Sequence, residues 1–361
     1  MATIMMAGGG TGGHVVPLLA VARELASRGH DCIFVGTRNG FEAKLVPPAG
    51  FPLEFIEIGG LKRVGVVRTI RTMTQLPVSV RRVFRLFAEH QPSAVFSMGG
   101  YAAGPVVLTA LWKSLPLIVM EPNAMPGLTN SKIGRFVTRA LLSFPEAGRF
   151  FPRGRSEVTG LPVRSEFFSI PAKPREATVT VLITGGSQGS RTLNQAAAAS
   201  WRYFKENRMP VRLIHQTGSA AHEAIASKFA GAGIQGEVVP FIDDMPGTFA
   251  QADLVVCRAG AGTVAELAAA GKPSILVPLP TAADQHQLRN AEAFSKLGAA
   301  RLVLDSQMDG GRLFEEVAKL SSQPGVLKHM GEQARTFAHP GAARRAADVV
   351  EESIATSAAR H

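Results

Sequence analysis

Near its N-terminus the chain reads IMMAGGGTGGHVVPLLAVA, from Ile4 to Ala22. A short apolar run ends in a cluster of glycines, and an apolar pattern of helical period follows directly. Glycines let the backbone approach a ligand closely, because no Cβ stands in the way. The first amides of a helix have no partner within it, so they favour an anion or developing negative charge. The stretch predicts a strand, a ligand-binding glycine loop and a helix, with His14 placed to move a proton near neutral pH.

Two other interpretations of this stretch stay open. Gly8, Gly10 and Gly13 match the dinucleotide fingerprint G-x-G-x-x-G, but Arg38 follows the second predicted strand where an acidic residue would hold a ribose. Arg38 suits the 2′-phosphate of NADP, which keeps an NADP-dependent reductase as an alternative. His14 is equally consistent with an ordinary residue at a helix start. A P-loop is excluded, because no Lys-Ser or Lys-Thr follows the glycines.

Length and composition narrow the class of protein. A chain of 361 residues is long for a single core, so we expect two domains. Cys32 and Cys257 lie in apolar runs and are expected to be buried thiols of a reducing compartment, forming neither a disulfide nor a metal site. Because a predicted strand begins at once, we expect no signal peptide, and the uncharged run 102–112 is too short to span a bilayer.

The positive charge is concentrated in the first half of the chain. Residues 1–165 contain 19 Lys and Arg against 9 Asp and Glu, whereas residues 166–361 contain 20 against 19. Five arginines surround an apolar stripe in the predicted helix 67–89. That pattern fits a core stripe with a solvated basic face, or attachment to an anionic membrane surface. Nucleic acid is a less suitable partner, because aromatic residues are sparse and no binding motif is present.

Strand-like runs alternate with helical patterns along the whole chain, which predicts parallel sheets covered by helices on both faces. The predicted strands of the first series are 3–7, 32–36, 53–57, 94–98, 117–120 and 139–142. Its predicted helices are 14–28, 67–89 and 102–113, with short turns at 40–46 and 127–134. The second series places strands at 178–184, 211–215, 236–239, 253–257, 274–277 and 300–303.

The second series also opens with a strand and a glycine loop, Gly185–Ser190, before a helix from Arg191. A proline-rich linker separates the two series, so we place an N-terminal domain at 1–163 and a C-terminal domain at 164–340. The alanine-rich segment 341–361 is expected to form a helix that packs back on the N-terminal domain. Ligands are expected beyond the carboxyl ends of the strands.

A third glycine turn runs from Cys257 to Glu266, with a helix expected from about Gly262. Its free amides suit a phosphate. Glu266 is placed either to accept both hydroxyls of a ribose or to interact with the helix dipole, and position alone leaves these hypotheses level. Asn123 follows a predicted strand, where stabilising its own turn is favoured over binding a sugar hydroxyl.

Two acidic positions are better explained by capping than by chemistry. Asp284 precedes a helical pattern and is a good N-cap, although the polar segment 284–287 also suits a sugar. The pair Asp243–Asp244 suggests a metal site, but it stands at a helix start, where capping is the favoured role.

Taken in order, these motifs resemble the MurG family of peptidoglycan N-acetylglucosaminyltransferases, which convert lipid I to lipid II. The matching segments cover most of the chain: Gly9–His14, Gly99–Tyr101, Gly160–Arg164, Gly185–Gly189, Phe241–Met245 and the Glu266 turn. The resemblance implies an α/β GT-B fold, with two Rossmann-like parallel-sheet domains facing across a cleft. It implies UDP-GlcNAc as donor, lipid I as acceptor, no metal or other cofactor, and a peripheral position on the cytoplasmic face of the bacterial inner membrane. Other cell-wall synthesis proteins would be further partners.

The resemblance also assigns roles to single residues. His14 is expected to be the general base of an inverting transfer, Ile242 would pack on uracil, and Glu266 would hold the ribose. Ser187 would bind a phosphate, while Asn123 and Gln287 would read the sugar. The donor-binding positions are Thr11, Gly12, Gly13, Asn123, Arg164, Ser187, Ile242, Ala261, Gly262, Thr263, Val264, Ala265, Glu266 and Gln287.

Two segments depart from the family pattern. The chain has Met120-Glu121-Pro122-Asn123 where the family commonly has His-Glu-Gln-Asn, and the order Asp284-Gln285-His286-Gln287 leaves open which amide reads the sugar. Another GT-B enzyme, such as a lipid glycosyltransferase or an epimerase, and a non-catalytic membrane scaffold remain as alternatives.

Overall fold

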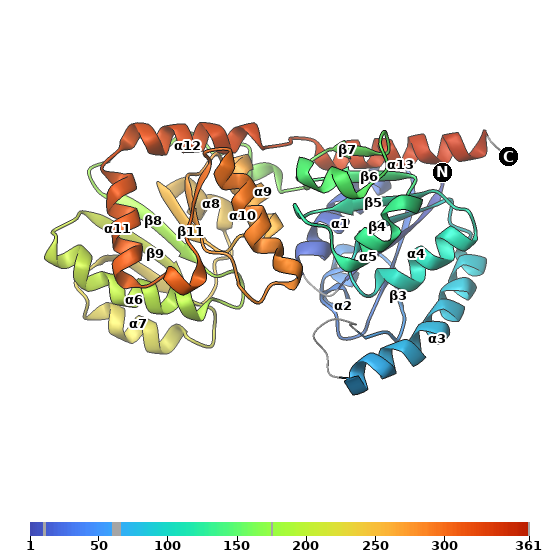
Figure 1. The fold of residues 1–361 in the computed structure, drawn as a ribbon, viewed down its shortest axis with the longest axis horizontal. Helices are drawn as coiled ribbons and strands as arrows, with labels where there is room; N and C mark the ends of the chain where they lie inside the picture. Colours follow the sequence, from blue (N-terminus) through green and yellow to red (C-terminus); the bar gives the residue numbers. More distant parts are fainter. Residues whose placement is uncertain (10–11, 60–65, 175, 360–361) are drawn as a thin grey trace. The chain divides into compact units, whose positions relative to one another are not determined.

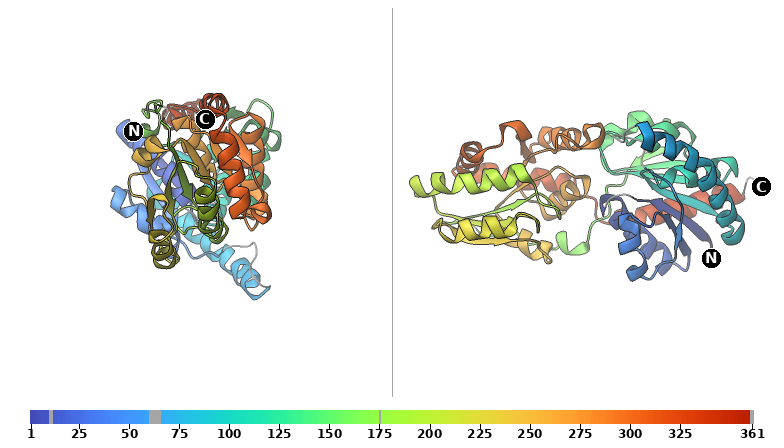
Figure 2. Two further views of the ribbon diagram at one scale, coloured as in Figure 1. Left: turned by 90° about the vertical axis from the view of Figure 1, so that its left-hand side faces the viewer. Right: turned by 90° about the horizontal axis from the view of Figure 1, so that it is seen from below.

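The computed structural model describes every residue except 10–11, 60–65, 175 and 360–361. The chain divides into two compact units (Figure 1): unit 1 contains Met1–Val163 and Gly341–His361, and unit 2 contains Arg164–Pro340. Within each unit, helices cover both faces of one parallel sheet (Figures 1 and 2). Each unit is therefore an α/β domain with its own core.

The described strands of unit 1 form a seven-stranded sheet in the order β3-β2-β1-β4-β5-β6-β7. β1 is buried after its first residue, and a strand covered on both faces needs the continuous apolar run that the sequence shows. The order reverses between β1 and β4, so the loops after these strands meet at the carboxyl edge of the sheet. The strands are β1 (Thr3–Gly8), β2 (Asp31–Gly36), β3 (Leu53–Phe55), β4 (Ala94–Gly99), β5 (Leu117–Glu121), β6 (Arg139–Leu142) and β7 (Ser156–Val158).

The helices of unit 1 bury their apolar faces on this sheet. In α1 the side chains of Val15, Leu18 and Leu25 are buried, as the helical period predicts. The helices are α1 (Gly12–Ser27), α2 (Phe41–Leu45), α3 (Val66–His90), α4 (Ala103–Trp112), α5 (Leu128–Ile133) and α13 (Ala342–Ala358), with 3₁₀ turns η1 (Pro47–Ala49), η2 (Gly134–Phe136) and η3 (Pro145–Phe150). All of the helices and turns predicted for the first half of the chain are therefore present.

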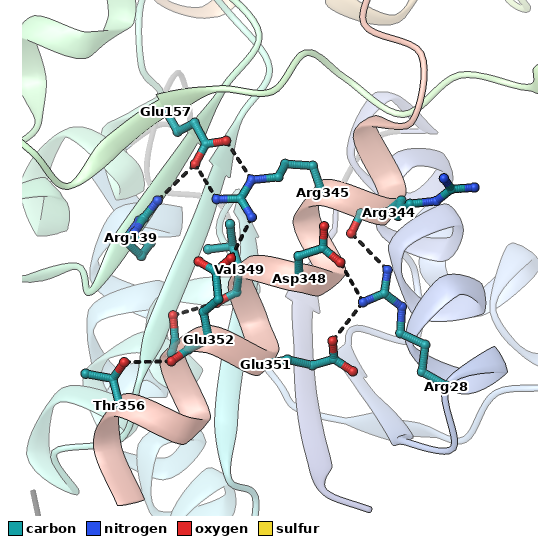
Figure 3. Close-up of polar contacts among 11 residues, drawn as sticks. Arg28, Arg139, Glu157, Arg344, Arg345, Asp348, Val349, Glu351, Glu352 and Thr356 are labelled. Atoms are coloured by element: carbon teal, nitrogen blue, oxygen red, sulfur yellow. Dashed lines mark hydrogen bonds and ion pairs between the residues drawn. The ribbon is translucent and has the colours of Figure 1, made fainter. Parts of the chain in front are cut away.

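The C-terminal helix α13 packs on α1 and on the strands of unit 1. Figure 3 shows the two arginine clusters that hold it. Arg28, the residue directly after α1, contacts Asp348 and Glu351 at 2.7 Å each, and Arg345 of α13 contacts Glu157 of β7 at 2.7 Å. Several small side chains of α13 are fully buried. The last segment of the chain thus completes the first domain rather than the second.

The described strands of unit 2 form a six-stranded sheet in the order β10-β9-β8-β11-β12-β13, which reverses between β8 and β11. The strands are β8 (Val179–Thr184), β9 (Val211–Gln216), β10 (Gln235–Val239), β11 (Leu254–Cys257), β12 (Ser274–Leu276) and β13 (Ala300–Leu302). The helices are α6 (Arg191–Glu206), α7 (His222–Ala230), α8 (Met245–Gln251), α9 (Ala261–Ala270), α10 (His286–Lys296), α11 (Gly310–Ser321) and α12 (Pro324–Thr336), with turns η4 (Ser165–Phe167), η5 (Ala283–Gln285) and η6 (Asp305–Gln307).

Two features differ from the sequence predictions. The edge strand β7 was not predicted, because its three residues carry no apolar run. Asp284 does not cap α10: the N-cap residue is Gln285, without a side-chain cap, and both residues have positive φ. In the described part of the chain, none of the helices has the length and apolar character needed to cross a membrane.

Candidate active site

His14 is the third residue of α1 and is partly buried. Its Nδ1 lies 3.3 Å from the carbonyl oxygen of Gly9. A carbonyl oxygen only accepts hydrogen bonds, so Nδ1 carries the hydrogen and Nε2 is the basic nitrogen of the neutral ring. This arrangement suits a general base that takes up its proton at Nε2.

The loop after β4 closes over the Gly9 carbonyl. Gly100 has φ +85°, and a Cβ on it would lie 2.8 Å from the Gly9 oxygen and 3.5 Å from His14 Nδ1. Glycine is therefore required there for both conformation and space. The next residue, Tyr101, places its hydroxyl oxygen 3.3 Å from Thr37 Oγ1. The structure thus brings the loops that follow β1, β2 and β4 together around His14.

The loop after β5 is organised by Glu121, which is buried. Its carboxyl accepts hydrogen bonds from the backbone and side-chain amides of Asn123, at 3.0 and 3.2 Å, and from Nδ2 of Asn130 at 2.9 Å. Burial nevertheless raises the pKa of Glu121 to about 7. Asn123 therefore stabilises its own turn, as the sequence favoured. Thr129 links this loop to the previous one by donating to the Gly100 carbonyl at 2.9 Å.

In unit 2 the loop after β8 carries Ser187, which is exposed. The loop is anchored by Ser190, whose hydroxyl accepts the Leu193 amide at the start of α6. Arg258, at the end of β11, donates to Ser190 Oγ and to Asp305 Oδ1, both at 2.6 Å. Sequence reasoning missed Arg258, because its two partners lie 68 and 47 residues away in the chain.

Helix α9 begins at Ala261 without a side-chain cap, which leaves its first amides for a ligand. A Cβ added to Gly262 would meet nothing within 4 Å, as would one added to Gly12 at the start of α1. Thr263 and Ala265 are partly exposed, whereas the Val264 side chain is buried in the core. A ligand at Val264 would therefore contact only its backbone.

Glu266 lies beyond the first turn of α9, which contains no acidic residue. It is partly buried, and desolvation raises the pKa of its carboxyl to about 7, against the opposing positive charge of Arg164. A raised pKa means that the surroundings disfavour the carboxylate. Glu266 therefore lies past the turn where the helix dipole favours an acidic residue most, and its role at the ribose stays a prediction.

The other predicted donor-binding residues of unit 2 have diverse surroundings. Arg164 is exposed and stacks on Phe167, with its guanidinium 5.2 Å from the ring centre. Ile242 is buried. Gln287 accepts the Leu279 amide on Oε1 at 2.9 Å, so its side-chain nitrogen is the group directed to other partners.

The remaining predictions concern the Asp243–Asp244 pair, a metal site and the division of the predicted site residues between the two units. Asp244 caps α8 by accepting the Gly247 amide at 2.9 Å, which confirms the capping role. Over the described ranges, no group of three or more His, Cys, Asp or Glu side chains could hold a metal ion. Thr11 lies outside the described residues. Of the remaining predicted site residues, Gly12, Gly13, His14 and Asn123 belong to unit 1 and the others to unit 2.

Comparison with known proteins identifies the family. Residues 4–142 match the N-terminal domain of glycosyltransferase family 28, and residues 180–348 match its C-terminal domain. A protein of Solibacter usitatus is 59% identical over 97% of this chain and 96% of its own length. The chain belongs to glycosyltransferase family 28. Within this family the Solibacter protein is named UDP-N-acetylglucosamine–N-acetylmuramyl-(pentapeptide) pyrophosphoryl-undecaprenol N-acetylglucosamine transferase.

Two further comparisons agree with this assignment. A protein of Myxococcus xanthus with the same name is 40% identical over 97% of this chain and 92% of its own. The crystal structure of MurG from Acinetobacter baumannii superimposes with a TM-score of 0.82 at 31% identity, covering 98% of this chain and all of that one. The predicted resemblance and the GT-B fold class are confirmed, and the family is one of enzymes.

Proposed function

We propose that this chain transfers GlcNAc from UDP-GlcNAc to the 4-hydroxyl of MurNAc in lipid I, which forms lipid II in peptidoglycan synthesis. The observation that carries this proposal is the 59% identity, over nearly the full length, to a relative named for that transfer. The reaction inverts the anomeric centre, because the hydroxyl attacks directly as UDP departs. The proposed transfer needs no substrate besides UDP-GlcNAc and lipid I.

His14 is the general base in this proposal. It takes the proton of the MurNAc hydroxyl at Nε2 while its Nδ1–H stays on the Gly9 carbonyl. That carbonyl also stabilises the imidazolium that forms, because it accepts a hydrogen bond from a ring that has become positively charged. Positioned general-base help of this kind is worth about 10²–10⁴-fold in rate.

Unit 2 supplies the groups that bind UDP. The first amides of α9, the Ser187 loop and the Arg164 guanidinium stabilise the charge that grows on the departing diphosphate. Glu266 accepts the ribose hydroxyls, and Ile242 packs on uracil. Gln287 reads the GlcNAc, as does Asn123 of unit 1, whose turn is held by its hydrogen bonds to Glu121. With helix amides and an arginine in these roles, the transfer requires no catalytic metal and no other cofactor.

Unit 1 attaches to the cytoplasmic face of the cell membrane through α3 and α4. Trp112 is 74% exposed and packs on Phe84, with ring centres 4.7 Å apart, and Leu108 lies one turn away on α4. Arg81 and Arg85 are exposed on α3. Exposed apolar side chains on α4 together with exposed arginines on α3 suit insertion into an anionic interface. Binding to anionic vesicles that exceeds binding to neutral ones, and that falls with salt, supports this docking; equal binding to both contradicts it.

Transfer of labelled GlcNAc from UDP-GlcNAc to a short-chain lipid I analogue tests the proposed function, with and without a chelator. We expect transfer that survives chelation and is lost in His14→Ala. Loss of transfer on chelation would contradict a metal-free mechanism. Binding of UDP-GlcNAc without any transfer would contradict the proposed acceptor and favour another sugar-nucleotide enzyme of this fold.

A further inference from the structure

Glu42, the second residue of α2, is a buried carboxylate beside the first glycine loop, and the mechanism above gives it no role. Only 1% of its surface is exposed. Its Oε1 accepts hydrogen bonds from the backbone amide of Thr37 at 2.8 Å and from the Thr37 hydroxyl at 2.9 Å. A carboxylate is expensive to bury and persists only where it is well held. Its place in the fold therefore needs a reason.

Three glycines, from the loop after β1, the end of β2 and the loop before α2, make room for this side chain. A Cβ on Gly9 would lie 2.7 Å from the Glu42 carboxyl, one on Gly40 2.1 Å from it, and one on Gly36 2.3 Å from the Glu42 side chain. Gly40 has an ordinary φ of −85°, and neither of the others has the positive φ that favours glycine. These glycines therefore serve space rather than conformation. The group that lies against Gly9 is thus the Glu42 carboxyl, a part of the chain and not a bound ligand.

Gly9 connects Glu42 to His14. Its α-carbon faces the Glu42 carboxyl, and its carbonyl oxygen accepts Nδ1–H of His14. The α-carbon of Gly100 closes the other side of that carbonyl. Glu42 also reaches the same loop by a second route, since the Thr37 hydroxyl that donates to it lies 3.3 Å from the Tyr101 hydroxyl. The loop that contains Gly9 therefore contacts Glu42 directly, and the loop that contains Tyr101 is linked to Glu42 through Thr37.

We propose that Glu42 is a positioning residue for His14. By fixing Gly9, it holds the carbonyl that keeps Nδ1 of His14 protonated and Nε2 basic, and it fixes the direction of the imidazole. This inference rests on the proposed role of His14 as the base. A residue in this position does not touch the substrate. Its loss should lower the rate, because a catalytic group that is displaced by about 1 Å loses about 10²-fold in rate.

Nitrogen-15 NMR of the full-length protein with labelled histidines tests the inference without any turnover. His14→Gln identifies the His14 resonances among those of the 9 histidines. We expect a protonated Nδ1 in the unmodified protein and a mixture of tautomers in Glu42→Ala. Glu42→Gln keeps the volume and an acceptor for Thr37, so its change should be smaller. Glu146→Ala is the matched control, because Glu146 is exposed on η3 of the same unit and should leave the His14 signals unchanged.

Kinetics provide the second measurement. Glu42→Ala should lower kcat about 10²-fold with little change in the KM for UDP-GlcNAc, whereas Glu146→Ala should change neither. If Glu42→Ala does not fold, Glu42→Gln carries both measurements. Identical His14 signals in every folded variant, or a kcat that falls only with the folded fraction, would overturn the proposal. Altered His14 signals in a protein without transferase activity would uphold the positioning role and refute the proposed function alone.

Discussion

Replacing Glu266 by glutamine is expected to make unit 2 more stable while it weakens the binding of UDP. Burial raises the pKa of this carboxyl from 4.5 to about 7. A shift of that size places a penalty of about 3 kcal/mol on the ionised form in the folded chain. Glutamine has nearly the same shape and never ionises, so it removes the penalty.

The sign and the pH window follow from linkage. In the unfolded chain Glu266 is ionised above pH 4.5, so above pH 7 the folded state carries the full penalty. As the pH falls below 7, the folded carboxyl takes up a proton and the penalty shrinks, until it vanishes below pH 4.5. Glu266→Gln should therefore raise the free energy of unfolding by about 3 kcal/mol at pH 8 and by less than about 1 kcal/mol at pH 5.

Urea unfolding followed by tryptophan fluorescence measures this difference. The chain has two tryptophans, and Trp201 is 7% exposed in unit 2. In a Trp112→Phe background, Trp201 alone reports on that unit. Glu315→Gln is the control, because the Glu315 side chain is 68% exposed on α11. A stabilisation by Glu266→Gln that is the same at both pH values, or none at pH 8, would refute the reasoning.

The same variant tests the assignment of Glu266 to the ribose. Hydrogen bonds to a charged acceptor contribute about 1.5–3 kcal/mol, so calorimetry should show UDP bound about tenfold more weakly, or worse. The loss should be smaller for 2′-deoxy-UDP, which has one hydroxyl fewer to donate. An unchanged affinity for UDP would place the ribose elsewhere.

Three other substitutions probe separate parts of the molecule. His14→Ala should lower kcat by about 10²–10⁴-fold and leave the calorimetric affinity for UDP-GlcNAc unchanged; weaker donor binding would argue against a role confined to the base. Arg258→Ala removes the ion-pair partner of Asp305 and a hydrogen bond to Ser190, so the free energy of unfolding of unit 2 in urea should fall by about 3 kcal/mol. Arg28→Ala removes the ion pairs that hold α13 and should cost about 1 kcal/mol in thermal unfolding, an effect that should shrink in 1 M salt.

Much of the fold could be predicted from local pattern. Strands covered on both faces must be apolar throughout, so β1 and β8 are visible as uninterrupted runs that end in glycine loops. Short edge strands lack this signature, which is why β7 was missed. Turn chemistry was also an incomplete guide. Asp284 has the side chain of a good cap, but Gln285 occupies the N-cap position of α10 and both residues adopt positive φ.

The sequence by itself determined the order of strands and helices, the glycine loops at the strand ends and the position of His14 at a helix start. These depend on residues that are neighbours in the chain. Only the tertiary structure decided which groups surround each polar side chain. It buried Glu42 against three glycines, bound Arg258 to partners from two distant loops and raised the pKa of Glu266. The physical reason is that desolvation and hydrogen bonding depend on spatial neighbours, which the fold gathers from segments far apart in sequence.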